Sequence, residues 1–529
     1  MNKRNGNIAV LVSLLMVIVL GLVLATYAYA GPDPAYDDAT YILEAHYMAM
    51  GNFYDALTNV FTFSFMEVVP YAISFYLFGY GTTQAVVTSL CEYFLLIILT
   101  FLLAKRIIDK RYAVLAAFFT AITPFVVLYA TRVLPDMILG IFIALVLYFY
   151  ASTKKNKLDY FVLGIVLSLS IYAKTEAFAF LGFFGFFIFM EIFYSSFQHS
   201  RKGSAASYIN NSLLFGSFVL GILIGLFVYF FIYYIYVRSP FFIFTHYTFH
   251  PGDLFSNIMM LNPFTSAAYF LETFSIGLLF YFFIAGGVVA ILKKNTKAAI
   301  IFSATFFFVL YLVFGSSSLT NYAVVPTATR FFAAVVAPLA TLSAYLVREV
   351  SNKVFKVTGS SIIKYLSIIL LILAIVLYDA QQIYLITVYY NSAIEYKSTI
   401  FHDAARYIEN TSNAPTYVYC ITGHGFNIVS ISFANFEFKF NRNYMALSIF
   451  PNESYGAKST CNESILQTKG IHSFLLGINL NASNNSYVKA WLNNSCSLSF
   501  VKQYGSKSNF FIDIYRVYPT KNISQSSPE

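Results

Sequence analysis

Ionisable side chains at the ends of apolar segments are the residues of this sequence best suited to chemistry, because charges close to a bilayer cost free energy and are kept where they are used. Placing Asp, Lys or Arg at the centre of a membrane helix costs about 2.5–3.5 kcal/mol on insertion scales. Four short connecting segments carry nearly all of these residues. They supply three carboxylates and three cations, namely Asp37, Asp38, Asp136, Arg132, Lys174 and Arg330.

This combination of charges suits the transfer of a group from a phosphate. The leaving phosphate needs cations to stabilise its charge, and its second pKa near 6 leaves little need for a proton donor. The acceptor hydroxyl needs a carboxylate base. A divalent ion, Mg or Mn, could bridge Asp37, Asp136 and the phosphate. If the four segments converge in space, we expect a site for a phosphate-linked donor.

Several of these residues also have a simpler structural explanation. Asp37 and Asp38 lie where the N-cap and first turn of a helix would be, and carboxylates favour helix N-termini. Turn chemistry could account for Asp136, and Lys174 could pair locally with Glu176. We keep Glu176 with Lys174 as a substrate-binding residue, and which acid of the first segment is the base stays open.

The composition excludes an ordinary soluble domain. Of 529 residues, 58% are hydrophobic and 11% are charged, whereas charged residues make up about 25% of a typical globular chain. The formal net charge is +9, but Lys and Arg cluster in short segments between apolar runs, which is typical of membrane topology. No basic helix or aromatic-basic stripe favours nucleic acid. We therefore predict a polytopic α-helical membrane protein that contacts lipids and does not bind nucleic acid.

The apolar stretches can be threaded consistently through a bilayer, whose core needs roughly 20 apolar residues per helix. About eleven stretches qualify, namely residues 8–30, 83–104, 112–131, 134–151, 160–173, 176–195, 209–236, 266–292, 298–314, 329–347 and 365–389. With the N-terminus inside and the C-terminus outside, every basic cluster falls on the cytoplasmic side, as the positive-inside rule requires. Arg132, Lys174 and Arg330 then lie on the opposite side, where cations are otherwise scarce.

Three segments are expected to face outward without crossing. Residues 31–65 form a first outer loop, and the apolar run that follows lies between two outside points, so residues 66–80 should form a juxtamembrane helix in the outer leaflet. In the outer loop 237–265, His246 and His250 could cover the site and bind substrate, although its aromatics also fit an interfacial belt.

Residues 28–30 resemble a signal-peptidase site, but the preceding run is long enough to span, which favours a retained anchor.

From about residue 391 the composition changes abruptly, so we divide the chain into a transmembrane domain, 1–390, and an extracytoplasmic domain, 391–529. Residues 402–408 show helical spacing of apolar residues. Residues 415–421, 473–478, 497–503 and 509–517 alternate in the manner of strands. The prediction for this tail is a small α/β domain.

The tail also carries most of the N-x-S/T sequons, at Asn410, Asn452, Asn462, Asn481, Asn484, Asn493 and Asn522. Chance in Asn/Ser-rich loops is one explanation, but an outside location favours glycosylation and suggests an archaeal or eukaryotic host. Cys420, Cys461 and Cys496 permit one disulfide whose pairing the spacing does not determine. The expected location is the plasma membrane, or the endoplasmic reticulum membrane in a eukaryote.

At the charged residues of the connecting segments, namely Asp37, Asp38, Arg132, Asp136, Lys174 and Arg330, the chain resembles the GT-C glycosyltransferases. The similarity is to the branch of protein O-mannosyltransferases and the lipid A aminoarabinose transferase. Asp-Asp stands where Asp-Glu is common in that branch, and Val69 where a second proline is usual. The Trp-Trp-Asp signature of the oligosaccharyltransferase branch is absent, since Trp491 is the only tryptophan. The similarity rests on six segments in order, at 36–41, 69–79, 104–106, 132–136, 173–176 and 330–338.

This resemblance implies a GT-C fold and inverting transfer of a sugar, with mannose as the first candidate. The donor would be a polyprenyl- or dolichyl-phosphate sugar, and the acceptor a protein, glycan or lipid. Asp37 would be the base or a metal ligand, Asp136 the second acid, and Lys174 and the arginines phosphate contacts. The alternatives are a transporter or flippase for a lipid-linked sugar, which would need charges near the bilayer midplane, and an inactive relative that binds glycan.

Overall fold

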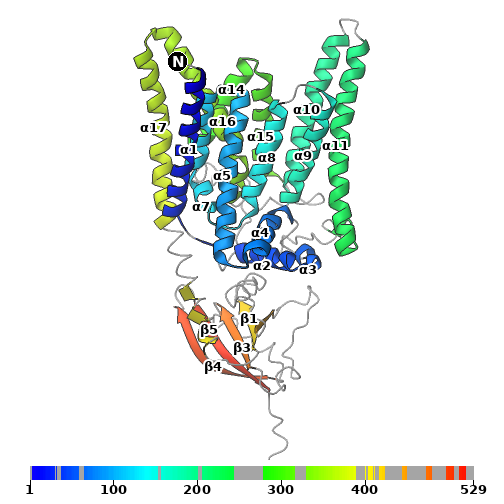
Figure 1. Cartoon of the computed structure of the whole chain (residues 1–529), viewed down its shortest axis with the longest axis vertical. Coiled ribbons are helices and arrows are strands. Elements are labelled where there is room, and N and C mark those ends of the chain that lie inside the picture. The colour runs from blue at the N-terminus through cyan, green and yellow to red at the C-terminus, as the bar shows by residue number, and fades with distance from the viewer. Residues whose placement is uncertain are drawn as a thin grey trace, which may run out of the picture. The chain divides into compact units, whose positions relative to one another are not determined.

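Long helices make up most of the described chain in the computed structural model (Figure 1). The chain divides into two compact units, of which the first comprises Met1–Tyr29, Asn52–Pro70 and Val86–Tyr389 and the second Ala30–Gly51, Tyr71–Ala85 and Tyr390–Glu529. The structure describes residues 3–29, 31–32, 37–58, 65–152, 156–174, 176–200, 205–242, 278–315, 329–388, 399–400, 403–404, 406–408, 410, 416–422, 444–448, 472–478, 496–505 and 511–519.

The first unit is a bundle whose long helices run side by side (Figure 1). Within it, α9 packs on α8 and α11, and α16 packs on α6, α14 and α17. Its elements are α1 (Lys3–Tyr27), α3 (Phe53–Thr58), α5 (Thr82–Ile107), α6 (Lys110–Ile122), α7 (Pro124–Tyr129), α8 (Pro135–Ser152), α9 (Lys157–Ala173), α10 (Ala177–Ser200), α11 (Ala205–Val237), α14 (Leu278–Leu292), α15 (Thr296–Phe314), the 3-10 helix η1 (Thr329–Val335), α16 (Val336–Thr358) and α17 (Ser361–Ile386). The helix α4 (Phe65–Phe78) begins in this unit and ends in the other, and the first four residues of α5 belong to the other unit.

The predicted polytopic membrane fold is confirmed. Seven described helical segments are long and apolar enough to cross a membrane, namely Asn7–Tyr27, Thr82–Ile107, Ala177–Tyr194, Asn211–Val237, Thr296–Phe314, Phe331–Thr358 and Ser361–Ile386. The other predicted crossings coincide with the shorter helices α8, α9 and α14 and with the pair α6 and α7. The number of crossings therefore stays a prediction.

The predicted helix over 112–131 is divided in two at a proline. Thr123 has an extended backbone with ψ of 123°, and Pro124 is the first residue of α7. Proline disfavours helical geometry in the residue before it and lacks an N–H group for the helix interior. The chain therefore turns at this point, and α7 ends at Tyr129, three residues before Arg132.

Glycines allow α9 and α11 to pack with their backbones in contact. A Cβ on Gly164 would lie 2.2 Å from a carbonyl oxygen of α11, and a Cβ on Gly221 would lie 2.2 Å from a carbonyl oxygen of α9. The hydroxyl of Tyr172 on α9 donates a hydrogen bond to the carbonyl oxygen of Gly225, one turn further along α11. Small residues at such contacts are typical of membrane helices, whose association depends on close van der Waals packing. This contact fixes the C-terminal half of α9.

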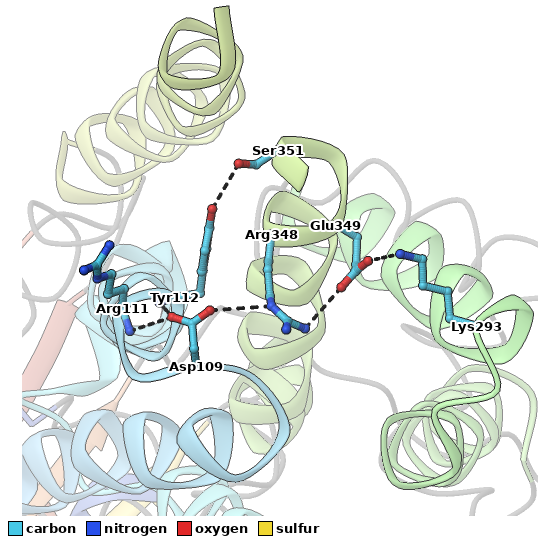
Figure 2. Close-up of polar contacts among 7 residues, drawn as sticks. All are labelled: Asp109, Arg111, Tyr112, Lys293, Arg348, Glu349 and Ser351. Carbon is cyan, nitrogen blue, oxygen red and sulfur yellow. Dashed lines mark hydrogen bonds and ion pairs between the residues drawn. The ribbon is translucent and has the colours of Figure 1, made fainter. Parts of the chain in front are cut away.

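An ion-pair network joins the start of α6, the end of α14 and the second half of α16 (Figure 2). Asp109 caps α6 by accepting hydrogen bonds from two backbone N–H groups of its first turn, at 3.0 and 3.4 Å, and its Oδ2 lies 3.5 Å from Nε of Arg348. Nη1 of Arg348 lies 3.1 Å from Oε1 of Glu349, which also pairs with Lys293. Partly exposed pairs contribute only about 0–1 kcal/mol each, so the network chiefly aligns the helix ends.

The C-terminal part of the second unit contains five strands, of which β1, β3, β4 and β5 were predicted and β2 was not. They form one five-stranded sheet of order β2-β1-β3-β5-β4, in which β1 pairs in parallel with β2 and β3, and β5 pairs antiparallel with β3 and β4. Ile400, Ala404 and Ile408 are buried at helical spacing, as the predicted amphipathic helix requires. The strands are β1 (Thr416–Thr422), β2 (Tyr444–Ser448), β3 (His472–Ile478), β4 (Cys496–Gly505) and β5 (Phe511–Pro519).

Candidate active site

A buried ion pair joins Asp136 and Lys174, two of the residues predicted from the sequence. Asp136 lies in the first turn of α8, and Lys174 directly follows the last residue of α9. Nζ of Lys174 lies 2.8 Å from Oδ1 of Asp136, and the two residues are 8% and 0% exposed. Because a carboxylate is favoured at a helix N-terminus and a cation at a C-terminus, both helix dipoles stabilise this pair.

Two further groups enclose Lys174. Its Nζ lies 3.3 Å from the ring centroid of Phe331 on η1, and 3.5 Å from Oε1 of Glu176. An aromatic face attracts a cation, most strongly where water is excluded, and Phe331 is buried. Contacts to α8, to η1 and to its own turn therefore hold the ammonium group in one position.

Arg132 is a second buried cation, in the turn between α7 and α8. Its N–H donates to the carbonyl oxygen of Tyr129 at 3.1 Å, and its carbonyl oxygen accepts a hydrogen bond from Oγ of Ser89 on α5 at 2.8 Å. Its guanidinium carbon lies 6.0 Å from the ring centroid of Tyr129. These contacts hold the turn against α5 and α7. Arg132 lies in this turn, four residues before Asp136 in the sequence.

Close backbone packing brings η1 to α8. A Cβ on Gly140, one turn after Asp136, would lie 3.2 Å from the carbonyl oxygen of Ala333 in η1. The absence of a side chain at this position lets the two backbones approach. Phe331, two residues before Ala333, thereby comes within reach of Lys174.

Aromatic side chains continue from Lys174 along α9 and α11. The ring centroid of Tyr172 lies 4.8 Å from that of Tyr229 and 5.1 Å from that of Phe65, and Tyr229 lies 5.2 Å from Tyr233. All four residues are buried, and tilted ring pairs at such distances are favourable. They form a buried aromatic wall, in which Tyr172 lies two residues before Lys174.

The predicted acidic pair opens α2 (Asp37–Ala49), in the second unit. Asp37 is the first helical residue, and Asp38 is fully buried. Further along, Glu44 is fully buried, and neither of its carboxylate oxygens has a hydrogen-bond partner among the described residues. Burial raises the pKa of Glu44 well above its ordinary value. It lowers the pKa of His46, whose ring centroid lies 4.3 Å from that of Tyr80.

Several predicted residues fall outside this description. Only the backbones of Asp37, in α2, and of Arg330, in η1, are described, and His246 and His250 lie in the undescribed segment 243–277. Asn410 is described and exposed, whereas the six other sequons and Cys461 lie outside the described residues. The roles predicted for these residues stay predictions.

Three residues of this arrangement were not selected from the sequence as site residues. Phe331 had a signal, because an aromatic residue directly follows a predicted phosphate-binding arginine. Glu44 also had one, a charge within an otherwise apolar turn of the first loop. Ser89 had none, since a serine inside an apolar helix commonly bonds its own backbone.

The predicted divalent metal stays a prediction, because only the backbone of Asp37, one of its two predicted ligands, is described. Among the described residues, no three His, Cys, Asp or Glu side chains lie close enough together to hold a metal ion. The charge of Asp136 is compensated by Lys174 at 2.8 Å, and a hard divalent ion would need several further oxygen ligands.

Comparison with known proteins identifies the fold. Residues 68–209 match the family described as dolichyl-phosphate-mannose-protein mannosyltransferase, and no curated protein matches the sequence. ArnT from Cupriavidus metallidurans in the apo state has a TM-score of 0.61 at 12% identity, over 94% of this chain and 97% of ArnT. ArnT bound to undecaprenyl phosphate has a TM-score of 0.54 at 12% identity, over 94% and 97% of the two chains. AglB, the oligosaccharyltransferase of Archaeoglobus fulgidus, solved with an inhibitory peptide and a dolichol-phosphate, has a TM-score of 0.50 at 14% identity, over 95% of this chain and 74% of AglB.

At these identities the solved structures establish the fold, and the family match locates the most similar segment. That segment contains Arg132, Asp136 and Lys174. The chain is therefore a multi-pass membrane protein with the GT-C fold of the membrane glycosyltransferases.

Proposed function

We propose that this chain is an inverting glycosyltransferase that uses a polyprenyl-phosphate sugar as its donor. The observation that carries the proposal is the buried cation Lys174, which is held between Asp136 and Phe331. Lys174 and Asp136 lie inside the segment 68–209 that matches the mannosyltransferase family. ArnT was solved with undecaprenyl phosphate and AglB with a dolichol-phosphate. Those complexes support a lipid phosphate as the donor, and the family's name makes mannose the first sugar to test.

Lys174 and Arg132 would hold the donor phosphate. Asp136 and Glu176 compensate the charge of Lys174 before a donor binds, which lowers the free energy needed to bury a cation. A side chain already fixed in one position loses little further entropy when a ligand binds. Arg132 and, as the sequence predicts, Arg330 would supply the additional positive charge that a phosphate requires.

In the proposed reaction the oxygen of the acceptor hydroxyl attacks the anomeric carbon of the sugar. The bond from that carbon to the phosphate oxygen breaks, and its electron pair leaves with the phosphate, whose charge the cations stabilise. The hydroxyl proton passes to a carboxylate of the acidic pair of α2, with Asp37 as the first candidate. Asp136 positions Lys174. The products are a glycoside of inverted configuration and polyprenyl phosphate.

The membrane placement belongs to the same proposal. The buried aromatic wall of Phe65, Tyr172 and Tyr229 supports binding of an isoprenoid chain beside the phosphate. The positive-inside pattern places the N-terminus in the cytoplasm and the reaction on the extracytoplasmic face, in the plasma membrane or the endoplasmic reticulum. The acceptor would be a protein, glycan or lipid exposed on that face.

A transporter or flippase is less well supported than an enzyme. Its substrate site would lie near the bilayer midplane, between helix halves, whereas Asp136 and Lys174 lie at the ends of α8 and α9. An inactive relative that binds glycan would retain the fold and lack transfer. Sugar transfer by the wild type, and its loss on replacement of the charged pair, would separate the enzyme from both alternatives.

The test uses the purified full-length protein in lipid nanodiscs with a panel of labelled polyprenyl-phosphate sugars. The wild type should transfer label to an acceptor, and Asp136→Asn and Lys174→Ala should lower that transfer by about 100-fold or more. Lys293→Ala is the matched control, because Lys293 also pairs with a glutamate but is 55% exposed and lies outside the site. Unchanged transfer in both site variants would refute the assignment.

A further inference from the structure

Glu44 is a buried carboxyl group that the proposed reaction does not use. It lies in α2, and neither of its carboxylate oxygens has a hydrogen-bond partner within the described part of the chain. The residues from Tyr41 to Ala45 are all buried. An unsatisfied buried carboxyl group destabilises the fold. A bound ligand that completed its hydrogen bonds would account for its presence.

The geometry of α2 relates Glu44 to the predicted base. Positions 37 and 44 are seven residues apart, which is two turns, so they fall on one face of the helix. A rise of about 1.5 Å per residue separates them by about 10 Å along the axis. If Asp37 takes the proton of the acceptor hydroxyl, a group at position 44 contacts the acceptor about 10 Å from the reacting oxygen. That separation is roughly the span of a disaccharide.

The chemistry of Glu44 indicates what it would bind. Burial raises the pKa of Glu44, which favours the neutral acid, and a neutral carboxyl group both donates and accepts a hydrogen bond. A sugar hydroxyl likewise donates and accepts. A cationic ligand would require the ionised carboxylate instead, so hydroxyl groups fit better than an ammonium group.

We propose that Glu44 hydrogen-bonds hydroxyl groups of a sugar on the acceptor, so that the preferred acceptor already carries a saccharide. This inference rests on the proposed function and deepens it by naming the acceptor class. Glu44 would contact a part of the acceptor that does not react. It would therefore determine specificity, and its loss would change KM for the acceptor more than kcat.

The experiment compares wild type, Glu44→Gln and Glu44→Leu with three acceptors: a serine peptide, octyl mannoside and octyl dimannoside. Wild type should prefer the dimannoside. Glutamine also donates and accepts, so Glu44→Gln should retain that preference. Glu44→Leu should raise KM for the dimannoside by about tenfold, which is the effect of losing one or two hydrogen bonds. It should nevertheless unfold at an equal or higher temperature, because leucine removes an unsatisfied buried group.

Three results would overturn the inference: an unchanged KM in Glu44→Leu, a loss of thermal stability in both variants, or wild-type transfer to the serine peptide without preference for the dimannoside. The second result would assign Glu44 a purely structural role. Wild-type transfer to none of the acceptors, from any donor of the panel, would contradict the proposed function itself and this inference with it. Transfer by the wild type combined with an unchanged KM in Glu44→Leu would remove this inference alone.

Discussion

Nζ of Lys174 lies 2.8 Å from Oδ1 of Asp136, so the end of α9 and the start of α8 are joined by a buried ion pair. The two residues are 38 positions apart in the sequence. A buried pair of this kind contributes little net stability compared with apolar residues of similar volume, but removal of one partner is costly. The pair therefore serves to fix a cation in position more than to stabilise the fold.

This relationship predicts a strongly non-additive effect of substitution. Lys174→Met leaves Asp136 buried without this cation, and should lower the free energy of unfolding by about 3 kcal/mol. The double variant Lys174→Met with Asp136→Leu should regain much of that loss, because no charge of the pair remains. Equilibrium unfolding of wild type, the single variants Lys174→Met and Asp136→Leu, and the double variant measures the coupling. Lys293→Met is the control for an exposed pair and should cost less than about 1 kcal/mol; an equal loss in both single lysine variants would contradict the account.

The backbone contact between α9 and α11 predicts a position-specific effect of adding one methyl group. Gly221→Ala places a Cβ 2.2 Å from a carbonyl oxygen of α9, so the helices must separate, at a cost of about 1–3 kcal/mol. Because α9 ends at the site lysine, donor binding should weaken as well. Gly182→Ala on α10 is the matched control, since a Cβ there meets no atom within 4 Å. Similar stability and donor affinity in the two variants would show that the contact does not position the site.

The ring of Phe331 gives a prediction for donor binding. With Nζ of Lys174 3.3 Å from the ring centroid, the cation–π contact is worth about 0.5–2 kcal/mol. Phe331→Leu should raise KM for the donor by the corresponding several-fold, whereas Phe331→Tyr retains an aromatic face and should leave KM nearly unchanged. Steady-state kinetics with varied donor concentration would check both variants. Equal KM values for the leucine and tyrosine variants would exclude a role for the ring.

His46 predicts a loss of stability in acid. Burial lowers the pKa of His46 in the folded protein, below the value of about 6.5 expected in an unfolded chain. The unfolded chain therefore binds more protons, so this contribution is fully present above about pH 6.5 and is lost as the pH falls through 6.5 towards the folded pKa. Thermal unfolding of wild type and His46→Gln over this range measures the difference. Glu44, whose pKa is raised, has the opposite slope but is common to both proteins, so parallel curves would contradict the prediction.

The sequence predicted the membrane fold and the strands of the tail because both rest on strong local patterns. Apolar length and the distribution of Lys and Arg located the helices, and alternation located β1, β3, β4 and β5 but not β2. The break at Pro124 within the predicted helix 112–131 was missed. Apolar length alone does not separate one helix from two, even though the proline was a visible signal.

The site could be predicted as a set of residues but not as an arrangement. Lys174 was expected either to contact phosphate or to pair with Glu176, and it lies closer to Asp136, at 2.8 Å, than to Glu176, at 3.5 Å. The contact to Phe331 depends on the approach of η1 to α8 at Gly140, which is a tertiary feature without a local pattern. The predicted partnership of Asp37 with Asp136 stays a prediction from the sequence.

The most direct measurement of the central claim is the stoichiometry and stereochemistry of a single reaction. Purified protein is incubated with a polyprenyl-phosphate sugar carrying label in the sugar, and products are analysed by mass spectrometry and NMR. The account predicts one polyprenyl phosphate released for each sugar transferred, an anomeric configuration opposite to that of the donor, and loss of both products in Asp136→Asn. Release without transfer, retention of configuration, or equal turnover by Asp136→Asn would contradict it.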